Sequence, residues 1–396
     1  LDPHNARETY RQLREIQRDT EVGVIVIEHH TEFIGDYCDQ LTMVADGDVA
    51  WTEPVDIGLN RVDELLDADI HPPQVTQIAR QLPEGDGTLP NGRYPVTVEQ
   101  AVDALPTAVS KESRSVKPDG RGSDKSLISV NDVTHGYPTL REGQKIVLDS
   151  LDLELYADSR VALVGANGAG KSTLLRLLTG LESPDEGTVT VLDNDTNETL
   201  PEELAEEAVY IHQNPEEMFV EETVRDDIAY YLRNRNDPDI ERRVTDVIEF
   251  LDLEDIADRD GRLLSIGQQR RASLAIGLVT DPTIVLLDEP TGSLDLQSRR
   301  EVTRMLSRSV SRTETVVVAT HDLQLVAEWA DRVIVLGPNG ILADETPRSV
   351  FEQPELLAQA HLRPPQVVEL SDQLGINSPS LTIPEIVDRL TAQEVQ

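Results

Sequence analysis

Hydrophobic and polar residues follow two different periods along this chain, and from residue 127 onward the two alternate. Short runs of consecutive apolar residues are typical of strands buried in a parallel sheet, and they occur at residues 161–164, 209–212, 283–287 and 315–319. Between these runs apolar residues recur at helical spacing, and the predicted helices cover residues 174–178, 242–251 and 268–280. Residues 128–133 and 146–156 alternate as strands with one exposed face do. The pattern predicts an α/β fold with a largely parallel sheet and covering helices.

The first hundred residues repeat the last hundred. In the first part Leu1-Asp2 is followed by a predicted helix over 5–18, an apolar run over 22–27 and Glu28-His29-His30. In the second part Leu294-Asp295 is followed by a predicted helix over 299–312, an apolar run over 315–319 and Thr320-His321-Asp322. The offset is 292 or 293 residues. It is again 292 between the two Pro-Pro-Gln-Val stretches, at 72–75 and 364–367, each of which leads into a short amphipathic helix. A near-constant offset over this span indicates duplication.

The duplication predicts a domain plan. We expect residues 1–56 to be the C-terminal remnant of a first copy of the repeated domain, 57–105 its appendix, 127–350 a complete second copy and 351–396 a C-terminal appendix. Residues 110–126 are rich in Ser, Lys, Arg, Gly and Asp without an apolar period, which predicts a flexible linker over 106–126, or alternatively a basic docking patch. Residues 1–105 contain no glycine-rich phosphate-binding motif such as the one described below for the second copy. We therefore expect the corresponding motif of the first copy to lie upstream of Leu1, so that the sequence is N-terminally incomplete.

One glycine-rich stretch lies between the apolar run 161–164 and a predicted helix. It consists of Gly165, Ala166, Asn167, Gly168, Ala169, Gly170, Lys171, Ser172 and Thr173. The spacing Gly-x4-Gly-Lys-Ser is that of a phosphate-binding loop, whose glycines let several backbone N–H groups surround an anion at a helix N-terminus. Lys171 can reach the β- and γ-phosphates and the Ser172 hydroxyl can ligate Mg²⁺.

Two acidic residues follow the most apolar run, 283–287. Asp288 stands at the C-terminal end of this predicted strand, where it can hold Mg²⁺ beside the phosphate loop. Glu289 can accept a proton from an attacking water. Solvation of a strand end is the alternative interpretation, but a run this apolar favours a site.

These motifs together resemble those of an ABC-type ATPase. The phosphate loop, Leu264-Ser-Ile-Gly-Gln268, Asp288-Glu289, Ser293-Leu-Asp295 and His321 occur in that family's order and spacing. The resemblance covers residues 127–350 in full and residues 1–56 as the end of a sister domain. It implies a P-loop fold with an antiparallel β subdomain and a helical signature subdomain. Two departures are visible: Ile266 replaces the first signature glycine, and Asp158-Ser159 stands where the family often has glycine, with Asp158 expected to tolerate a positive φ.

The resemblance also implies the roles of individual residues. Glu289, His321 and Gln213 would be catalytic, and Ser172, Gln213 and Asp288 would hold Mg²⁺. Tyr137 would stack on adenine, residues 165–173 would bind the phosphates, and Ser265, Gly267 and Gln268 would form a signature that caps the γ-phosphate of ATP held by a paired domain. Such domains pair head to tail, so we expect this chain to bind Mg-ATP through its second copy and to hydrolyse it poorly without an upstream ATPase half or a second ATPase copy.

A narrower resemblance concerns the importers of the energy-coupling-factor type, which take up cobalt or vitamins. Gln213-Asn-Pro215, Met218-Phe219, Thr223-Val224 and Asp227-Ile-Ala229 are similar to the loop region of those ATPases, and the Pro-Pro-Gln-Val appendices are similar to their C-terminal region. It implies uptake of a metal ion, vitamin or other small solute, with residues 216–231 meeting a transmembrane coupling subunit and a separate membrane subunit binding the substrate. The chain would then be peripheral, at the cytoplasmic face of the cell membrane.

Composition adds an expectation about the environment. The net charge is −39, from 35 basic and 74 acidic residues spread along the whole chain. Dispersed acidity with ordinary apolar periods suggests a protein adapted to high salt, as in halophilic archaea, although an acidic mesophilic protein is the alternative. The acidic surface argues against nucleic acid as a partner.

Cysteine and hydropathy add two further points. Cys38, the only cysteine, lies in a helical pattern over 32–41 and is expected to be a packing residue in a reducing cytoplasm. No apolar run is long enough to span a bilayer, and no signal peptide is visible.

Two other functions compete with transport. A soluble tandem ABC ATPase acting on ribosomes or DNA would predict basic surfaces or insertions, which the sequence lacks. A nucleotide-sensing scaffold without hydrolysis is disfavoured by the intact Glu289 and His321.

Overall fold

The chain forms two compact units. The computed structural model describes residues 3–392 except Glu21, His29, Asp46, Glu84, 106–124, 140–142, Ser293, Asp295 and Asn339. Unit 1 comprises Leu1–Lys117, Phe351–Leu357 and Leu362–Gln396, and unit 2 comprises Pro118–Val350 and Ala358–His361. The expectations for Asp2, His29, Ser293, Asp295 and most of the linker therefore lie outside the described residues; Ser126, the last linker residue expected, begins a strand.

Unit 2 is built on a six-stranded sheet with the order β12-β11-β5-β10-β9-β8. Its strands are β5 (Ser159–Val164), β8 (Ala208–Ile211), β9 (Ile284–Asp288), β10 (Thr315–Thr320), β11 (Arg332–Gly337) and β12 (Gly340–Glu345). All neighbours are parallel except β12, which runs antiparallel to β11. Every residue of β9 and β10 is buried, which explains why both appear in the sequence as continuous apolar runs.

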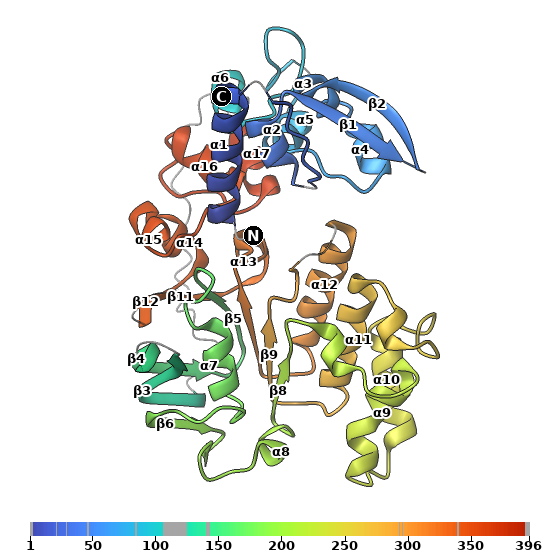
Figure 1. Cartoon of the computed structure of the whole chain (residues 1–396), viewed down its shortest axis with the longest axis vertical. Coiled ribbons are helices and arrows are strands. Elements are labelled where there is room, and N and C mark those ends of the chain that lie inside the picture. Colours follow the sequence, from blue (N-terminus) through green and yellow to red (C-terminus); the bar gives the residue numbers. More distant parts are fainter. Residues whose placement is uncertain are drawn as a thin grey trace. The chain divides into compact units, whose positions relative to one another are not determined.

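Successive residues of the central strands face two different cores. Ile284 and Leu286 of β9 pack into a core with Leu174 of α7 (Lys171–Leu177). Val285 and Leu287 pack into a second core, with residues of α9 (Val224–Asn234), α10 (Ile240–Phe250) and α11 (Ile266–Leu278). Figure 1 shows these three helices grouped beyond β8, on the side away from α7.

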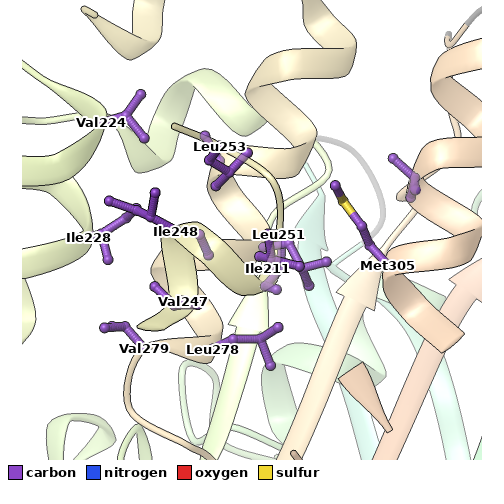
Figure 2. Close-up of a cluster of buried hydrophobic side chains, with 14 of the residues drawn as sticks. Ile211, Val224, Ile228, Val247, Ile248, Leu251, Leu253, Leu278, Val279 and Met305 are labelled. Carbon is purple, nitrogen blue, oxygen red and sulfur yellow. The ribbon is translucent and has the colours of Figure 1, made fainter. Parts of the chain in front are cut away.

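The helices around the second core form a compact helical subdomain. Figure 2 shows side chains of α9, α10 and α11 turned toward one another, among them Val224, Val247 and Leu278, all fully buried. Burying such a side chain stabilises the fold by ~1.5–3 kcal/mol. The same subdomain includes the short 3₁₀ helices η1 (Pro215–Met218) and η2 (Gly261–Leu263), so it carries both the segment after β8 and the start of the signature.

A second, antiparallel sheet covers the first core. Its order is β4-β3-β6-β7, with β3 (Ser126–Thr139), β4 (Gly143–Tyr156), β6 (Glu186–Val191) and β7 (Asn194–Asp195). This is the fold class that the sequence predicts, an α/β unit with an antiparallel β subdomain. The turn from β4 into β5 has Asp158 at a φ of 56°, the positive φ expected there. The remaining helices of unit 2 are α8 (Pro201–Leu204), α12 (Leu296–Ser309) and α13 (Leu323–Trp329).

Unit 1 contains the elements of the repeat. In order they are α1 (Pro3–Thr20), α2 (Thr31–Tyr37), β1 (Gln40–Ala45), β2 (Asp48–Pro54), α3 (Val55–Gly58), α4 (Val62–Asp67), α5 (Gln74–Gln81), α6 (Val98–Ala104), α16 (Gln366–Gln373) and α17 (Ile383–Thr391). The boundaries between the two units fall within the helices α14 (Pro347–Phe351) and α15 (Pro354–Gln359), so each of these helices has residues in both units.

Element starts recur at the offset seen in the sequence. The first residues of α2, β1, β2, α3, α4 and α5 lie 292 residues before those of α13, β11, β12, α14, α15 and α16. Antiparallel pairing of β1 with β2 likewise matches that of β11 with β12. The two segments therefore share local structure as well as sequence.

Two local predictions in unit 1 were wrong. Residues 22–27 were expected to be a strand, but they form none, and Ile25 and Ile27 are 95% and 101% exposed. Their counterpart β10 is held between β5 and β9, whereas β1 and β2 pair only with each other and no other strand is described in unit 1. The helix expected over 32–41 ends at Tyr37; Cys38 is its extended C-cap, half-buried, and strand β1 begins at Gln40.

Candidate active site

The phosphate loop connects β5 to α7 with the backbone that its glycines permit. Gly168 and Gly170 have φ values of 84° and 99°, in the left-handed region that favours glycine. A Cβ atom on Gly165 would lie 2.5 Å from the carbonyl oxygen of Leu336 on β11. The loop therefore packs tightly against the sheet, and α7 presents its N-terminus at the loop. Ala166, Asn167, Ala169, Ser172 and Thr173 complete the predicted stretch.

Lys171 is turned back onto this loop. Its ammonium group donates to the carbonyl oxygens of Gly165 at 2.8 Å and Ala166 at 3.4 Å, and its side chain is 7% exposed. The same nitrogen lies 3.7 Å from Oε1 of Glu289. Among the described residues this buried cation has polar contacts with two loop carbonyls and one carboxylate, which leaves it available to an anion bound in the loop.

Asp288 ends β9 beside the loop, and its two carboxylate oxygens differ. The hydroxyl of Tyr210 on β8 donates to Oδ2 at 2.9 Å. Oδ1 is buried and has no hydrogen-bond partner among the described residues. Because a buried carboxylate oxygen without a partner is costly, this geometry fits a group that binds Oδ1, such as Mg²⁺ or its water.

Glu289 and His321 form a pair at the ends of β9 and β10. Nδ1 of His321 lies 2.9 Å from Oε1 of Glu289, and the Thr320 hydroxyl donates to Oε2 at 3.3 Å. Burial lowers the pKa of His321, but the hydrogen bond and charge of Glu289 outweigh it, so the pKa is raised from its usual value. Lys171, Glu289 and His321 thus form one contiguous group of charges.

Asp322 links His321 to α12. Arg299 contacts both carboxylate oxygens of Asp322, at 2.7 and 2.8 Å, and the Thr291 hydroxyl donates to it at 3.1 Å. Asp322 also caps α13 by accepting the backbone N–H of Leu325. Sequence reasoning did not assign Arg299 or Thr291 a role, although Arg299 stands at the start of a predicted helix.

Gln213 and Tyr137 lie apart from this group of charges. Gln213 follows β8, is exposed, and precedes the 3₁₀ helix that Asn214 caps. The Tyr137 hydroxyl donates to Glu182 at 2.6 Å and contacts the Thr173 hydroxyl on α7 at 3.1 Å. Tyr137 is therefore anchored at the helix that follows the phosphate loop.

The signature residues begin α11 in the helical subdomain. Ser265 and Gln268 form a capping box, in which each side chain accepts the other's backbone N–H. Ile266 is 50% exposed, so replacement of a glycine there meets no steric obstacle. A Cβ atom on Gly267 would lie 2.4 Å from Oγ of Ser298, so this glycine is required by packing. Figure 1 shows α7 and α11 on opposite sides of β8 and β9.

The structure thus gathers Lys171, Asp288, Glu289 and His321 beside the phosphate loop and leaves the signature in the helical subdomain. Sequence reasoning missed Tyr210, which contacts Asp288. The signal that would have found it is positional, since Tyr210 pairs in register with Leu286, two residues before Asp288 on the adjacent parallel strand.

Comparison with known proteins gives consistent likenesses. A family model described as ABC transporter matches residues 148–292. A putative ABC transporter ATP-binding protein of Streptococcus agalactiae is 30% identical over 389 residues, which are 96% of this chain and 67% of that protein. One from Methanosarcina mazei is 27% identical over 403 residues, 98% of this chain and 67% of that protein. The chain spans about two thirds of the length of both relatives.

Solved structures share the fold. The ATP-binding cassette MJ0796, in a dimeric post-hydrolysis state with ADP and Pi, superposes with a TM-score of 0.51 at 25% identity, covering 56% of this chain and 99% of that one. CbiO1 of Clostridium perfringens, described as part of the ABC transporter complex CbiONQ, gives a TM-score of 0.53 at 24% identity, covering 63% of this chain and 100% of that one.

Proposed function

Since the chain belongs to the ABC transporter ATP-binding proteins, whose ATP hydrolysis is coupled to transport, we propose that it powers an importer of the energy-coupling-factor type. The cargo would be a metal ion, vitamin or other small solute. One observation carries the catalytic part of the proposal: Oε1 of Glu289 contacts both Lys171, at 3.7 Å, and His321, at 2.9 Å, beside the phosphate loop. The likeness to CbiO1 in fold and the Gln213-Asn-Pro215 segment support the importer type.

The reaction follows from the positions of these side chains. Backbone N–H groups of residues 165–173 bind the phosphates, and Lys171 moves from the loop carbonyls to the β- and γ-phosphate oxygens. Ser172 and Asp288 would hold Mg²⁺, with Gln213 joining when ATP is bound; the ion neutralises charge on the phosphates. Water attacks the γ-phosphorus while Glu289 accepts its proton, and the bond from the γ-phosphorus to the bridging oxygen breaks, so that ADP is the leaving group. His321 orients Glu289 and contacts the γ-phosphate.

We further propose that another ATPase copy completes the site. Ser265, Gly267 and Gln268 would cap ATP held by that copy, and its signature would cap ATP held at residues 165–173. The dimeric state of MJ0796 with ADP and Pi supports such pairing. Tyr137 would stack on adenine, since its hydroxyl is already fixed beside α7.

The membrane partner would dock beside the loop after β8. Val220 and Tyr230 in the segment 216–231 are 60% and 46% exposed, and Leu263 of η2, in the same helical subdomain, is 78% exposed. Exposed apolar side chains of this kind fit an apolar helix of a transmembrane coupling subunit. The chain would then sit at the cytoplasmic face of the membrane, and a separate membrane subunit would bind the substrate. Among the described residues no helix has the length and apolar character to cross a bilayer.

The catalytic assignment is tested by Glu289→Gln. This variant keeps the shape of the side chain but removes the proton acceptor, so we expect the ATPase rate to fall ~10²–10⁴-fold while ATP binding is retained. Glu254→Gln, the same change at an exposed position outside the site, is the matched control and should keep the full rate. A Glu289→Gln variant with normal turnover would refute the role of Glu289, and loss of ATP binding would indicate a structural role instead.

A further inference from the structure

Tyr210 hydrogen-bonds the carboxylate of Asp288, the proposed cation ligand at the end of β9. It lies on β8, directly beside β9, and its hydroxyl donates to Oδ2 of Asp288 at 2.9 Å. Asp288 is 2% exposed, and its other oxygen, Oδ1, has no partner among the described residues. Oδ2 of Asp288 is therefore fixed by a hydrogen bond from the protein, and Oδ1 remains available to a cation or its bound water.

Tyr210 is suited to be a permanent donor. A phenolic hydroxyl keeps its proton near neutral pH, so it can donate to the carboxylate. The hydroxyl can therefore satisfy a buried carboxylate oxygen without adding charge, in a way that a lysine or arginine could not.

A polar chain continues from Tyr210 along α7. Arg176 of α7 interacts electrostatically with Tyr210 and lies 3.3 Å from Oε1 of Glu182, whose Oε2 accepts the Tyr137 hydroxyl at 2.6 Å. The charge of Arg176 therefore acts on the Tyr210 hydroxyl. The chain joins the proposed adenine contact, Tyr137, to the proposed cation ligand, Asp288, through three side chains.

We propose that Tyr210 is a positioning residue for the divalent cation: it fixes Oδ2 of Asp288 so that Oδ1 points to the metal. The inference rests on the cation site proposed above. Without the phenol, both oxygens of a buried carboxylate lack a protein donor, which is costly. The carboxylate can then turn toward Arg270, a buried cation whose charge interacts with Asp288 and Glu289. Losing an outer-shell partner of this kind lowers metal affinity about 10–100-fold.

The experiment uses the Glu289→Gln chain, in which turnover is blocked so that binding can be measured. Mn²⁺ serves as the probe and is titrated by electron paramagnetic resonance in the presence of ATP. Adding Tyr210→Phe should weaken Mn²⁺ binding about 10-fold or more, while the affinity for ATP in EDTA and the unfolding temperature without metal stay unchanged. Tyr10→Phe is the matched control, because it removes a phenol that likewise donates to a carboxylate, Oε2 of Glu28 at 2.7 Å, but that lies in unit 1.

A second measurement uses the catalytically intact chain. Here Tyr210→Phe should raise the Mg²⁺ concentration needed for half-maximal ATP hydrolysis about 10-fold or more, and the rate at saturating Mg²⁺ should recover. A residue with a merely structural role would lower the saturating rate or the unfolding temperature without changing the dependence on Mg²⁺. Arg176→Met, which removes the positive charge that acts on Tyr210 but keeps the Tyr210 hydroxyl, should give a smaller loss of Mn²⁺ affinity; if Tyr210→Phe does not fold, this variant decides the matter.

The variant Asp288→Asn distinguishes an error in the proposed cation site from an error in the proposed role of Tyr210. If Asp288→Asn still binds Mn²⁺ normally, the proposed cation site is wrong and the role of Tyr210 falls with it. If Asp288→Asn loses Mn²⁺ but Tyr210→Phe binds it as the parent does, the site stands and the role of Tyr210 is refuted. Equal weakening by Tyr210→Phe and Tyr10→Phe would also refute it.

Discussion

Glu289 sits in an unusual backbone conformation that its surroundings hold in place. Its φ is 46°, a left-handed value uncommon for a residue with a side chain, and such a conformation costs of order 1–3 kcal/mol. The backbone N–H of Glu289 donates to the carbonyl oxygen of Ala319 at 2.8 Å, and its carboxylate contacts Lys171, Thr320 and His321. These contacts offset the strain and aim the carboxylate at the phosphate loop.

The pairing of His321 with Glu289 predicts a dependence of stability on pH. The groups facing His321 are Glu289 and Asp322, which raise its pKa, and Lys171, which lowers it; burial also lowers it, and the net shift is upward. A raised pKa in the folded state means that the pair stabilises the fold fully below the unfolded value of about 6.5. This contribution is lost as pH rises through the folded pKa.

The test compares His321→Gln with the parent chain between pH 5.5 and 8.5. The variant should unfold at a lower temperature at pH 5.5, by about 2–4 °C for each kcal/mol of lost interaction, and the difference should shrink toward pH 8.5. A constant difference between His321→Gln and the parent across this range would contradict the ion pair.

At this scale the sequence predicted the groups but not all of their partners. Lys171, Asp288, Glu289 and His321 were found because each stands at a fixed place relative to a glycine-rich loop or to the end of an apolar run. Tyr210 was missed because its partner, Asp288, is 78 residues away, and only the pairing of β8 with β9 brings them together. Strand order between distant segments is not encoded in local periodicity.

For whole helices and strands, too, the sequence predicts local preference but not whether a distant segment is available for pairing. Helices and strands of unit 2 were predicted because each buries an apolar stripe or run against neighbours within that unit. Residues 22–27 have the same kind of apolar run as β10, but among the described residues neither strand of unit 1 pairs with them, so their composition alone does not make a strand. An apolar run of this kind favours a strand, but it forms one only where a neighbouring strand is available to pair with it.

The two appendices pair with each other in unit 1. Oε1 of Gln366 accepts the backbone N–H of Val75, and Oε1 of Gln74 accepts that of Val367, at 3.4 and 3.1 Å. Both glutamines are buried, α5 contacts α16 and α17, and α6 contacts α16. Because the residues that exchange these bonds are equivalent in the repeat, the arrangement resembles the two-fold interface of a symmetric dimer.

This pairing should hold the chain together after cleavage between the copies. We expect a chain cut at a protease site inserted within 106–124 to elute as one particle in size-exclusion chromatography. In Gln74→Ala/Gln366→Ala, loss of two buried hydrogen bonds, each worth ~0.5–1.5 kcal/mol, should weaken association of the cut pieces about 10–100-fold. Gln81→Ala, on an exposed face of α5, is the matched control. Immediate separation of the cut chain with intact glutamines would contradict the prediction.

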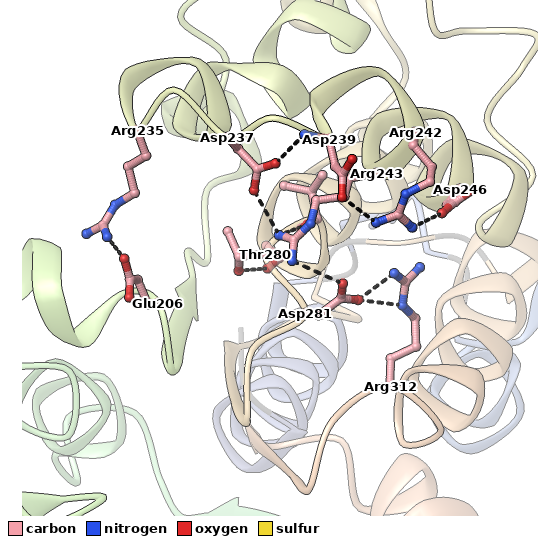
Figure 3. A network of polar contacts seen from close by, with 12 residues as sticks. Glu206, Arg235, Asp237, Asp239, Arg242, Arg243, Asp246, Thr280, Asp281 and Arg312 are labelled. Atoms are coloured by element: carbon pink, nitrogen blue, oxygen red, sulfur yellow. Dashed lines mark hydrogen bonds and ion pairs between the residues drawn. The ribbon is translucent and has the colours of Figure 1, made fainter.

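At the scale of the whole molecule the dominant feature is excess negative charge. With 74 acidic and 35 basic residues, the chain would keep a net charge of −39 even if every basic side chain were paired. Many are paired: in Figure 3, Arg312 contacts Asp281 at 2.5 Å and Arg243 lies between Asp237 and Asp281, at 3.7 and 3.8 Å. Salt weakens these attractions, but it also screens the larger repulsion among the unpaired carboxylates.

We therefore propose that the protein is adapted to high salt and predict that KCl stabilises it. Screening is nearly complete by 1 M, where the Debye length is about 3 Å, so most of the rise in unfolding temperature should occur below that concentration. A preferential-exclusion effect would instead keep growing above 1 M and would be larger for sulfate than for chloride at equal ionic strength. Unfolding is followed by circular dichroism in both salts from 0.05 to 3 M. A falling unfolding temperature below 1 M KCl would mean that the ion pairs outweigh the repulsion, and the proposed adaptation would be wrong.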